Sequence, residues 1–167
     1  MQNIEERTET SALTIAKYII SECSKENCSV NLLELQALLY RTQRYCLVAR
    51  GLSAFDDDFI AAPIGPIVPA VYQCFADVCP SRPIPCIWKQ EIFEINPWKK
   101  EAVNKAVRRY MRAAPKCKSD AESAVKNPLA YLKSQGLAWS KVYNGGEGKG
   151  KIIPKELLKK DCSAKLS

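Results

Sequence analysis

Apolar residues recur every three to four positions along two stretches near the start of the chain. From Ala12 to Lys25 they fall at the spacing of a helix with one buried face. Leu32 to Arg50 is apolar over more than half of a helical circumference, which predicts a helix at the centre of the fold. Asn31 and Glu34 fit a capping box at its start, and Gly51 is placed to end it. The pattern therefore predicts two well-delimited helices in the first third of the chain.

The rest of the chain predicts further helices and little sheet. Asn96-Pro97 predicts a helix start, with Asn as N-cap and Pro at the first position, and the helix runs to Ala114. Further helices are expected over 68–78 and 119–135, a short helix or turn over 138–144, and a final helical turn or two over 154–160. A loop or short strand is expected over 55–60, a short strand or irregular packing over 84–95, and a short strand over 152–153. These elements predict a compact, mainly α (α+β) single domain over 11–161, with at most a small two- or three-stranded antiparallel sheet. Residues 1–10 and 162–167 are expected to be flexible.

The run from Ile60 to Tyr72 holds three prolines and a glycine among apolar residues. Each proline fixes φ and removes a backbone donor, so the run cannot be one continuous helix or central strand. Gly65-Pro66 predicts a tight corner, and Pro69 fits the first turn of a new helix. We expect a rigid, buried corner at this point of the fold.

Composition restricts the chemistry. The chain of 167 residues has no histidine, which excludes Ser-His-Asp, Cys-His and His-based metal sites. We predict a protein that is not an enzyme and needs no cofactor. Eight cysteines occur without a Cys-x-x-Cys pair, so buried thiols are the favoured interpretation, while a four-cysteine zinc site assembled in space stays open. No apolar run is long enough for a bilayer and the start is polar, so we expect a cytoplasmic protein without a membrane span.

Positive charge is concentrated in the second part of the chain. Residues 1–100 hold ten Lys/Arg and twelve Asp/Glu, whereas 101–167 hold fifteen and six. Five of the basic residues follow helical spacing on one face: Lys105, Arg108, Arg109, Arg112 and Lys116. This basic stripe is either the solvated side of an amphipathic helix or a surface for an acidic partner or for phosphates.

A glycine-rich stretch, Gly145 to Lys151, satisfies the Gly-x-x-x-x-Gly-Lys part of a phosphate-binding loop. Ile152 stands where the magnesium-binding hydroxyl would be, and Pro154 leaves no room for the helix that such a loop needs. We therefore predict a surface loop and no nucleotide site.

Two blocks of the chain resemble the Panacea domain, also called the SocA-like antitoxin domain. They are Val30 to Tyr40 (V-N-L-L-E-L-Q-A-L-L-Y) and Gly51 to Phe55 followed by Ile60 to Tyr72 (I-A-A-P-I-G-P-I-V-P-A-V-Y), and their order and spacing agree with the family over some forty residues. Weaker similarity extends to Trp139 and to Ile152-Ile153. Ala37, Pro63 and Ile64 depart from the family pattern, so the chain is similar to a divergent, stand-alone member.

The resemblance implies a non-catalytic, antitoxin-like or phage-associated protein that neutralises or chaperones a toxin-like partner by direct contact. Four residues are predicted to contact this partner: Gln36, Tyr40, Tyr72 and Trp139. Aromatic side chains are favoured interface anchors, although Tyr40 and Tyr72 also suit core positions with a hydrogen-bonded tip. The alternative function is a nucleic-acid-binding accessory protein that uses the basic C-terminal half. The sequence predicts no oligomeric state.

Overall fold

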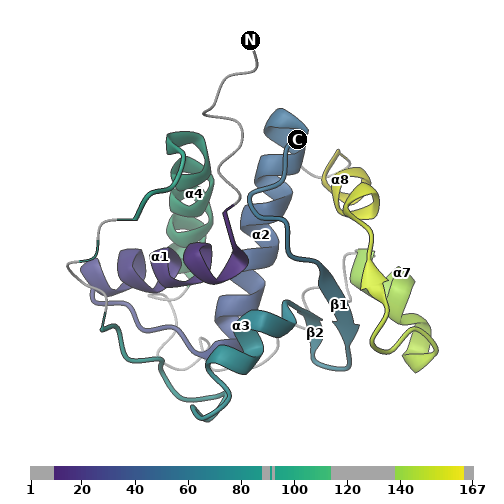
Figure 1. Cartoon of the computed structure of the whole chain (residues 1–167), viewed down its shortest axis with the longest axis horizontal. Coiled ribbons are helices and arrows are strands. Elements are labelled where there is room, and N and C mark those ends of the chain that lie inside the picture. The colour runs from purple at the N-terminus through teal and green to yellow at the C-terminus, as the bar shows by residue number, and fades with distance from the viewer. Residues whose placement is uncertain (1–9, 88–90, 92, 114–137, 164–167) are drawn as a thin grey trace.

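The structure, a computed structural model, describes residues 10–87, 91, 93–113 and 138–163 (Figure 1). This part contains six α-helices, one short 3-10 helix and a three-stranded antiparallel sheet. The elements in chain order are α1 (Ala12–Lys25), α2 (Leu32–Arg50), β1 (Phe59–Ala62), β2 (Gly65–Ile67), α3 (Pro69–Cys74), α4 (Pro97–Ala113), α7 (Ala138–Tyr143), η2 (Asn144–Gly146), β3 (Ile152–Ile153) and α8 (Lys155–Ser163). The predicted fold class, mainly α with a small antiparallel sheet, is confirmed.

Helices α1 and α2 begin and end at the predicted residues because local caps define them. The side chain of Ser11 accepts a hydrogen bond from the Thr14 amide at the start of α1. At the start of α2, Asn31 and Glu34 form the predicted capping box. Gly51 ends α2 with φ at 67°, a left-handed conformation that favours glycine.

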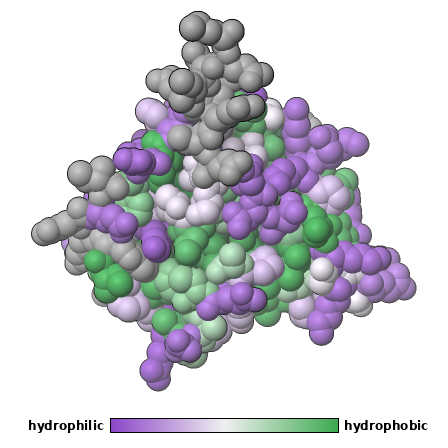
Figure 2. Space-filling model, viewed as in Figure 1, coloured by the Kyte–Doolittle hydropathy of each residue, from purple (hydrophilic) through white to green (hydrophobic). Residues whose placement is uncertain are grey.

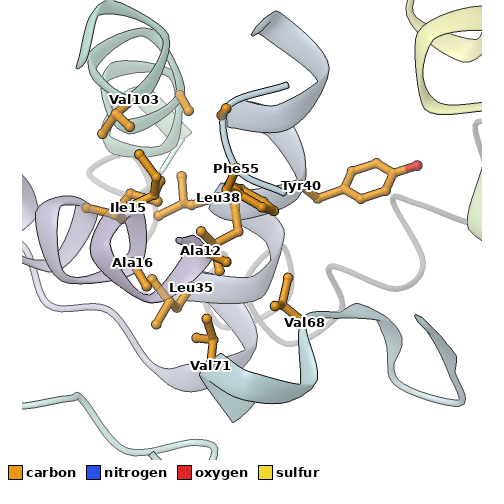
Figure 3. Close-up of a cluster of buried hydrophobic side chains, with 14 of the residues drawn as sticks. Ala12, Ile15, Ala16, Leu35, Leu38, Tyr40, Phe55, Val68, Val71 and Val103 are labelled. Atoms are coloured by element: carbon orange, nitrogen blue, oxygen red, sulfur yellow. The ribbon is translucent and has the colours of Figure 1, made fainter. Parts of the chain in front are cut away.

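Helix α2 runs through the middle of the fold. Helices α1 and α4 lie on one side of it, and the sheet, α7 and α8 lie on the other (Figure 1). Side chains from α1, α2, α3 and α4 meet in one hydrophobic cluster, and its labelled members are Ala12, Ile15, Ala16, Leu35, Leu38, Phe55, Val68, Val71 and Val103 (Figure 3). Tyr40 belongs to the same cluster, and its ring extends toward the sheet side of α2 (Figure 3). Both sides of α2 are therefore buried, as its wide apolar surface predicts.

The corner predicted between Ile60 and Tyr72 is a β-hairpin followed by a short helix. Strand β1 pairs with β2 in the register Ala62↔Gly65, so the turn is formed by Pro63 and Ile64. The prediction that Gly65-Pro66 makes the corner is wrong by two residues, because both belong to β2. Gly65 has φ at 126°, which a side chain would oppose.

Helix α3 begins at Pro69, as predicted, but ends at Cys74 and not at Val78. The next residues form tight turns, with the Ala76 amide bonded to the Gln73 carbonyl and the Val78 amide to the Phe75 carbonyl. The six-residue helix buries only Val71 among its own positions, so little packing supports a longer one.

Other predictions fall partly or wholly outside the described residues. The helix expected over 119–135 lies outside them. Of the segments expected to be flexible, 1–10 and 162–167, residues 1–9 and 164–167 also lie outside them, whereas Thr10 is described and buried. Within 84–95, the described residues form no regular strand. An isolated bridge joins Asn31 to Pro83 just before this stretch, and the Ile84 amide donates to the Val30 carbonyl. Helix α8 continues to Ser163, two residues past the predicted end of the domain.

Candidate protein-interaction surface

Three of the four residues predicted to contact a partner are buried. Gln36, Tyr40 and Trp139 expose 3%, 0% and 1% of their surface. The prediction that they form a contact surface is therefore wrong for this conformation. Tyr72 is half-buried and packs against the core.

The buried residues instead hold the hairpin against the helices. The Gln36 side-chain carbonyl accepts a hydrogen bond of 2.8 Å from the Val68 amide, just before α3 begins. The Trp139 indole N–H donates a 2.8 Å hydrogen bond to the Ala62 carbonyl, at the end of β1. Tyr40 packs edge-on against a β1 side chain, Phe59, with the ring centroids 5.4 Å apart. Gln36 Oε1 and the Trp139 indole N–H thus satisfy buried backbone groups, which gives these two atoms a role within the fold.

The basic stripe lies on the surface. Lys105, Arg108, Arg109 and Arg112 are all exposed on α4, and Lys116 lies outside the described residues. Lys105 is paired with Glu101 at 3.5 Å, one turn earlier on the same helix. Both side chains are more than half exposed, so this pair contributes little stability and opens readily to another anion.

A groove between α2 and α4 adjoins the basic stripe. It has a volume of about 290 Å³ and is lined by Tyr45, Cys46, Val48, Ala49, Arg50, Trp98, Glu101, Ala102 and Lys105. Ala49 and Ala102 are too short to fill the space between the helices. Half-buried Trp98 and Tyr45 supply aromatic surface, and Arg50 and Lys105 place cations at the groove. We call this feature the α2–α4 groove.

The α2–α4 groove and the basic stripe form one continuous face of α4. Trp98, Glu101 and Lys105 are spaced at i, i+3 and i+7 on α4, so they lie in a row along the helix. Arg109 and Arg112 continue the same row at i+11 and i+14. An aromatic recess thus leads directly to a line of cations.

Contacts at both ends of the helix pair fix the width of the groove. At one end, the Arg50 guanidinium lies over the Trp98 ring, 5.1 Å from its centroid. At the other end, the Tyr110 hydroxyl donates a 2.6 Å hydrogen bond to Glu34. Burial, and then the adjacent Glu34 carboxylate, raise the pKa of Tyr110, which therefore stays protonated as a donor. Because Arg50 ends α2 and Trp98 begins α4, the two helices are antiparallel.

The described residues offer no arrangement typical of a metal or nucleotide site. They contain no group of three or more His, Cys, Asp or Glu side chains that could hold a metal ion. In the glycine-rich stretch, the Gly148 amide donates to the Tyr143 carbonyl and the Gly150 amide to the Ala61 carbonyl. These amides are engaged within the fold, which agrees with the prediction of a surface loop that does not cradle phosphate.

One lysine is buried next to the groove. Lys99 is 8% exposed, and its ammonium donates a 3.0 Å hydrogen bond to the Thr10 hydroxyl. Burial lowers the pKa of Lys99. Its Nζ also lies 5.5 Å from the Trp98 ring centroid, so two cations, Lys99 and Arg50, lie within cation–π distance of this ring. This arrangement fixes the aromatic wall of the groove in place.

Comparison of the chain with protein-family models, with curated proteins and with solved structures finds no match. None of the helices that the structure describes has the length and apolar character needed to cross a bilayer. On the face shown in Figure 2, hydrophobic residues gather across the middle and hydrophilic residues surround them.

Sequence reasoning found the basic stripe but missed the groove beside it. The signal was present, since Trp98, Lys105 and Arg112 stand seven residues apart and share one helical face. In the sequence, Trp98 reads as the first residue of the buried face of α4. The structure shows that Trp98 is half-buried and lines the groove between α2 and α4, which the sequence of α4 alone does not indicate.

Proposed function

We propose that the protein binds an acidic partner protein through the α2–α4 groove and the basic stripe, in the manner of an antitoxin that holds its toxin by direct contact. The observation that carries the proposal is the continuity of an aromatic recess with four exposed cations on α4. The antitoxin character rests on the resemblance of Val30–Tyr40 and Ile60–Tyr72 to the Panacea domain.

The groove suits one large apolar anchor. A volume of about 290 Å³ holds a single aromatic or branched side chain, and Trp98 and Tyr45 offer flat surfaces for it. Burying such an anchor removes apolar area from water at roughly 25 cal/mol per Å². Burial of the anchor would supply affinity, and the neighbouring charges would determine which partner binds.

The charges favour an acidic partner. This surface carries five basic residues: Arg50 and Lys105 at the groove, and Arg108, Arg109 and Arg112 beyond it. Among the groove-lining residues, Glu101 is an exposed carboxylate. A complementary acidic surface would be steered toward α4 and would associate faster at low salt. The partner therefore combines an apolar anchor with flanking Asp or Glu residues.

The test is co-purification with the protein encoded by the adjacent gene, followed by calorimetry. Ala49 is exposed and lines the groove, so Ala49→Arg fills the recess and adds no bulk to the core. We expect at least a tenfold loss of affinity, about 1.4 kcal/mol. Lys105→Glu combined with Arg109→Glu should slow association and weaken its salt dependence.

The matched control is Lys149→Glu, which reverses an exposed charge in the loop before β3, away from α4. It should bind like the unsubstituted protein. Equal affinity for the Ala49→Arg variant and the unsubstituted protein contradicts the groove as the binding site. Absence of a complex with the adjacent gene product contradicts the antitoxin character.

Nucleic-acid binding is the second candidate, and the exposed stripe of four cations on α4 is the observation that favours it. It predicts binding of a fluorescent 20-base-pair duplex or single strand that weakens as salt rises. The slope of log affinity against log salt should become shallower when Arg108, Arg109 and Arg112 are replaced by alanine. Binding that is absent, or unchanged by these substitutions, rules this function out and leaves the acidic protein as the partner.

A further inference from the structure

The chain enters α1 at a fixed point beside the α2–α4 groove. Thr10 is 7% exposed, and its hydroxyl accepts the 3.0 Å hydrogen bond from the ammonium of Lys99. Two residues later, the Ala12 amide donates a 2.8 Å hydrogen bond to the Asp57 carboxylate. Because Nζ of Lys99 lies 5.5 Å from the ring centroid of Trp98, the chain that precedes Thr10 is attached next to the aromatic wall of the groove.

The segment before Thr10 has a charge opposite to that of the groove. Residues 1–9 contain three glutamates, at positions 5, 6 and 9, and one arginine. The groove presents Arg50 and Lys105, and further cations follow along the basic stripe. Opposite charges attract each other, so an acidic segment attached at Thr10 is drawn toward the cations of α4.

The same segment carries an apolar side chain next to its carboxylates. Ile4 is branched and apolar, and Glu5 and Glu6 follow it directly. A groove of about 290 Å³ has room for one isoleucine side chain against Trp98 and Tyr45. Burial of this side chain would remove apolar area from water. The segment therefore has the chemistry that we propose for the partner, one apolar anchor with acidic residues beside it.

The segment is long enough to reach the groove. Ile4 stands six residues before Thr10, and an extended chain spans about 3.3 Å per residue, so Ile4 can lie up to roughly 20 Å from Thr10. The wall of the groove from Trp98 to Lys105 is about 10 Å long, at 1.5 Å per helical residue. A short tether gives an effective concentration in the millimolar range, so even a weak contact is well populated.

We propose that residues 4–9 bind the α2–α4 groove when no partner is present, with Ile4 as the anchor and the glutamates beside the cations of the groove. The segment then competes with the partner and lowers its apparent affinity. This inference rests on the proposed function, because it assigns the groove two ligands of the same chemistry, one within the chain and one on the partner.

Methyl NMR on the full chain tests the contact in the absence of the partner. The isoleucine δ1 methyl groups are labelled with carbon-13, and the Ile4 signal is identified by its absence from the Ile4→Val variant. At low salt, we expect nuclear Overhauser effects from the Ile4 methyl group to ring protons of Trp98 or Tyr45. An Ile4 methyl group that shows no such effects overturns the proposal.

Charge reversal tests how the segment is held. Glu5→Lys with Glu6→Lys should abolish the nuclear Overhauser effects, and both positions precede the first helix, so the fold is retained. The matched control is Glu26→Lys with Asp77→Lys, which makes the same change in net charge at two exposed positions that do not line the groove. The control should keep the effects. Their persistence in the Glu5/Glu6 variant overturns recognition of the segment by charge.

Calorimetry with the adjacent gene's protein product tests the competition. The Glu5/Glu6 variant should bind about two- to tenfold more tightly than the unsubstituted protein, as expected if the segment occupies the groove in about half to nine-tenths of the free molecules. Unchanged affinity overturns the competition. If the product binds neither protein, the proposed function fails, whereas the Ile4 contact is still decided by the spectra of the free protein.

Discussion

Replacing Tyr110 with phenylalanine removes one hydroxyl from the contact that joins α4 to the start of α2. That hydroxyl lies 2.6 Å from Glu34 Oε2 and 3.3 Å from the Ser29 carbonyl. Glu34 is 8% exposed, so little water can replace the lost donor. Its carboxylate would keep the amide of Asn31 at 3.1 Å and the side-chain amide of Asn31 at 3.0 Å.

The expected cost is about 1.5–3 kcal/mol, the range for a hydrogen bond to a charged group. A double-mutant cycle with Glu34→Gln separates this bond from its surroundings. Glutamine can still accept from Tyr110, but a neutral acceptor is worth about half as much. The cycle should therefore give a coupling energy of about 1 kcal/mol between the two positions.

Urea unfolding followed by circular dichroism at 222 nm measures these free energies. Tyr45→Phe, a half-buried tyrosine in the α2–α4 groove, is the control and should stay within about 0.5 kcal/mol of the unsubstituted protein. A cost below about 0.5 kcal/mol for Tyr110→Phe would refute the reasoning, because the Glu34 contact would then not fix the helix pair.

Three further substitutions test other parts of the structure. Trp139→Phe leaves the buried Ala62 carbonyl without its donor and removes part of a buried ring, so unfolding free energy should fall by about 2–4 kcal/mol in urea; an unchanged value would contradict its bracing role. Gly65→Ala forces a side chain onto φ of 126° and should cost about 1–3 kcal/mol by thermal unfolding, whereas no loss would mean that the hairpin relaxes freely. Burial raises the pKa of Cys46 from 9.0 to about 12, so the unfolded chain releases this proton first, and the stability that is full below pH 9 declines as pH rises toward 12. Between pH 8 and 10.5 the unsubstituted protein should lose about 2 kcal/mol more than Cys46→Ser, and equal losses would show that this thiol titrates normally.

Local signals were enough to predict the helices whose ends are capped by residues close to them in the sequence. The Asn31–Glu34 box and Gly51 set both ends of α2, and neither depends on distant residues. The hairpin was harder, because Gly65-Pro66 satisfies both a corner and an edge strand. In the structure Gly65 pairs with Ala62, so Gly65-Pro66 is part of a strand. This pairing depends on two segments together, and it cannot be predicted from Gly65-Pro66 alone.

The residues of the candidate site also divide into those whose exposure could be predicted from the sequence and those whose burial could not. Exposure of Lys105 and Arg112 follows from helical spacing and could be predicted. Burial of Gln36 and Trp139 could not, because their partners, the Val68 amide and the Ala62 carbonyl, lie 32 and 77 residues away. A polar or aromatic residue looks like an interface anchor until the backbone group that it satisfies is known.

Hydrogen–deuterium exchange on the complex with the adjacent gene's protein product tests the binding surface most directly. We predict that binding slows exchange at the C-terminal end of α2, from Tyr45 to Arg50, and along the described part of α4, from Trp98 to Arg112. These amides border the groove and the basic stripe. Slower exchange confined to the β1–β2 hairpin or to α7 and α8, with both of these segments unchanged, would contradict the proposal.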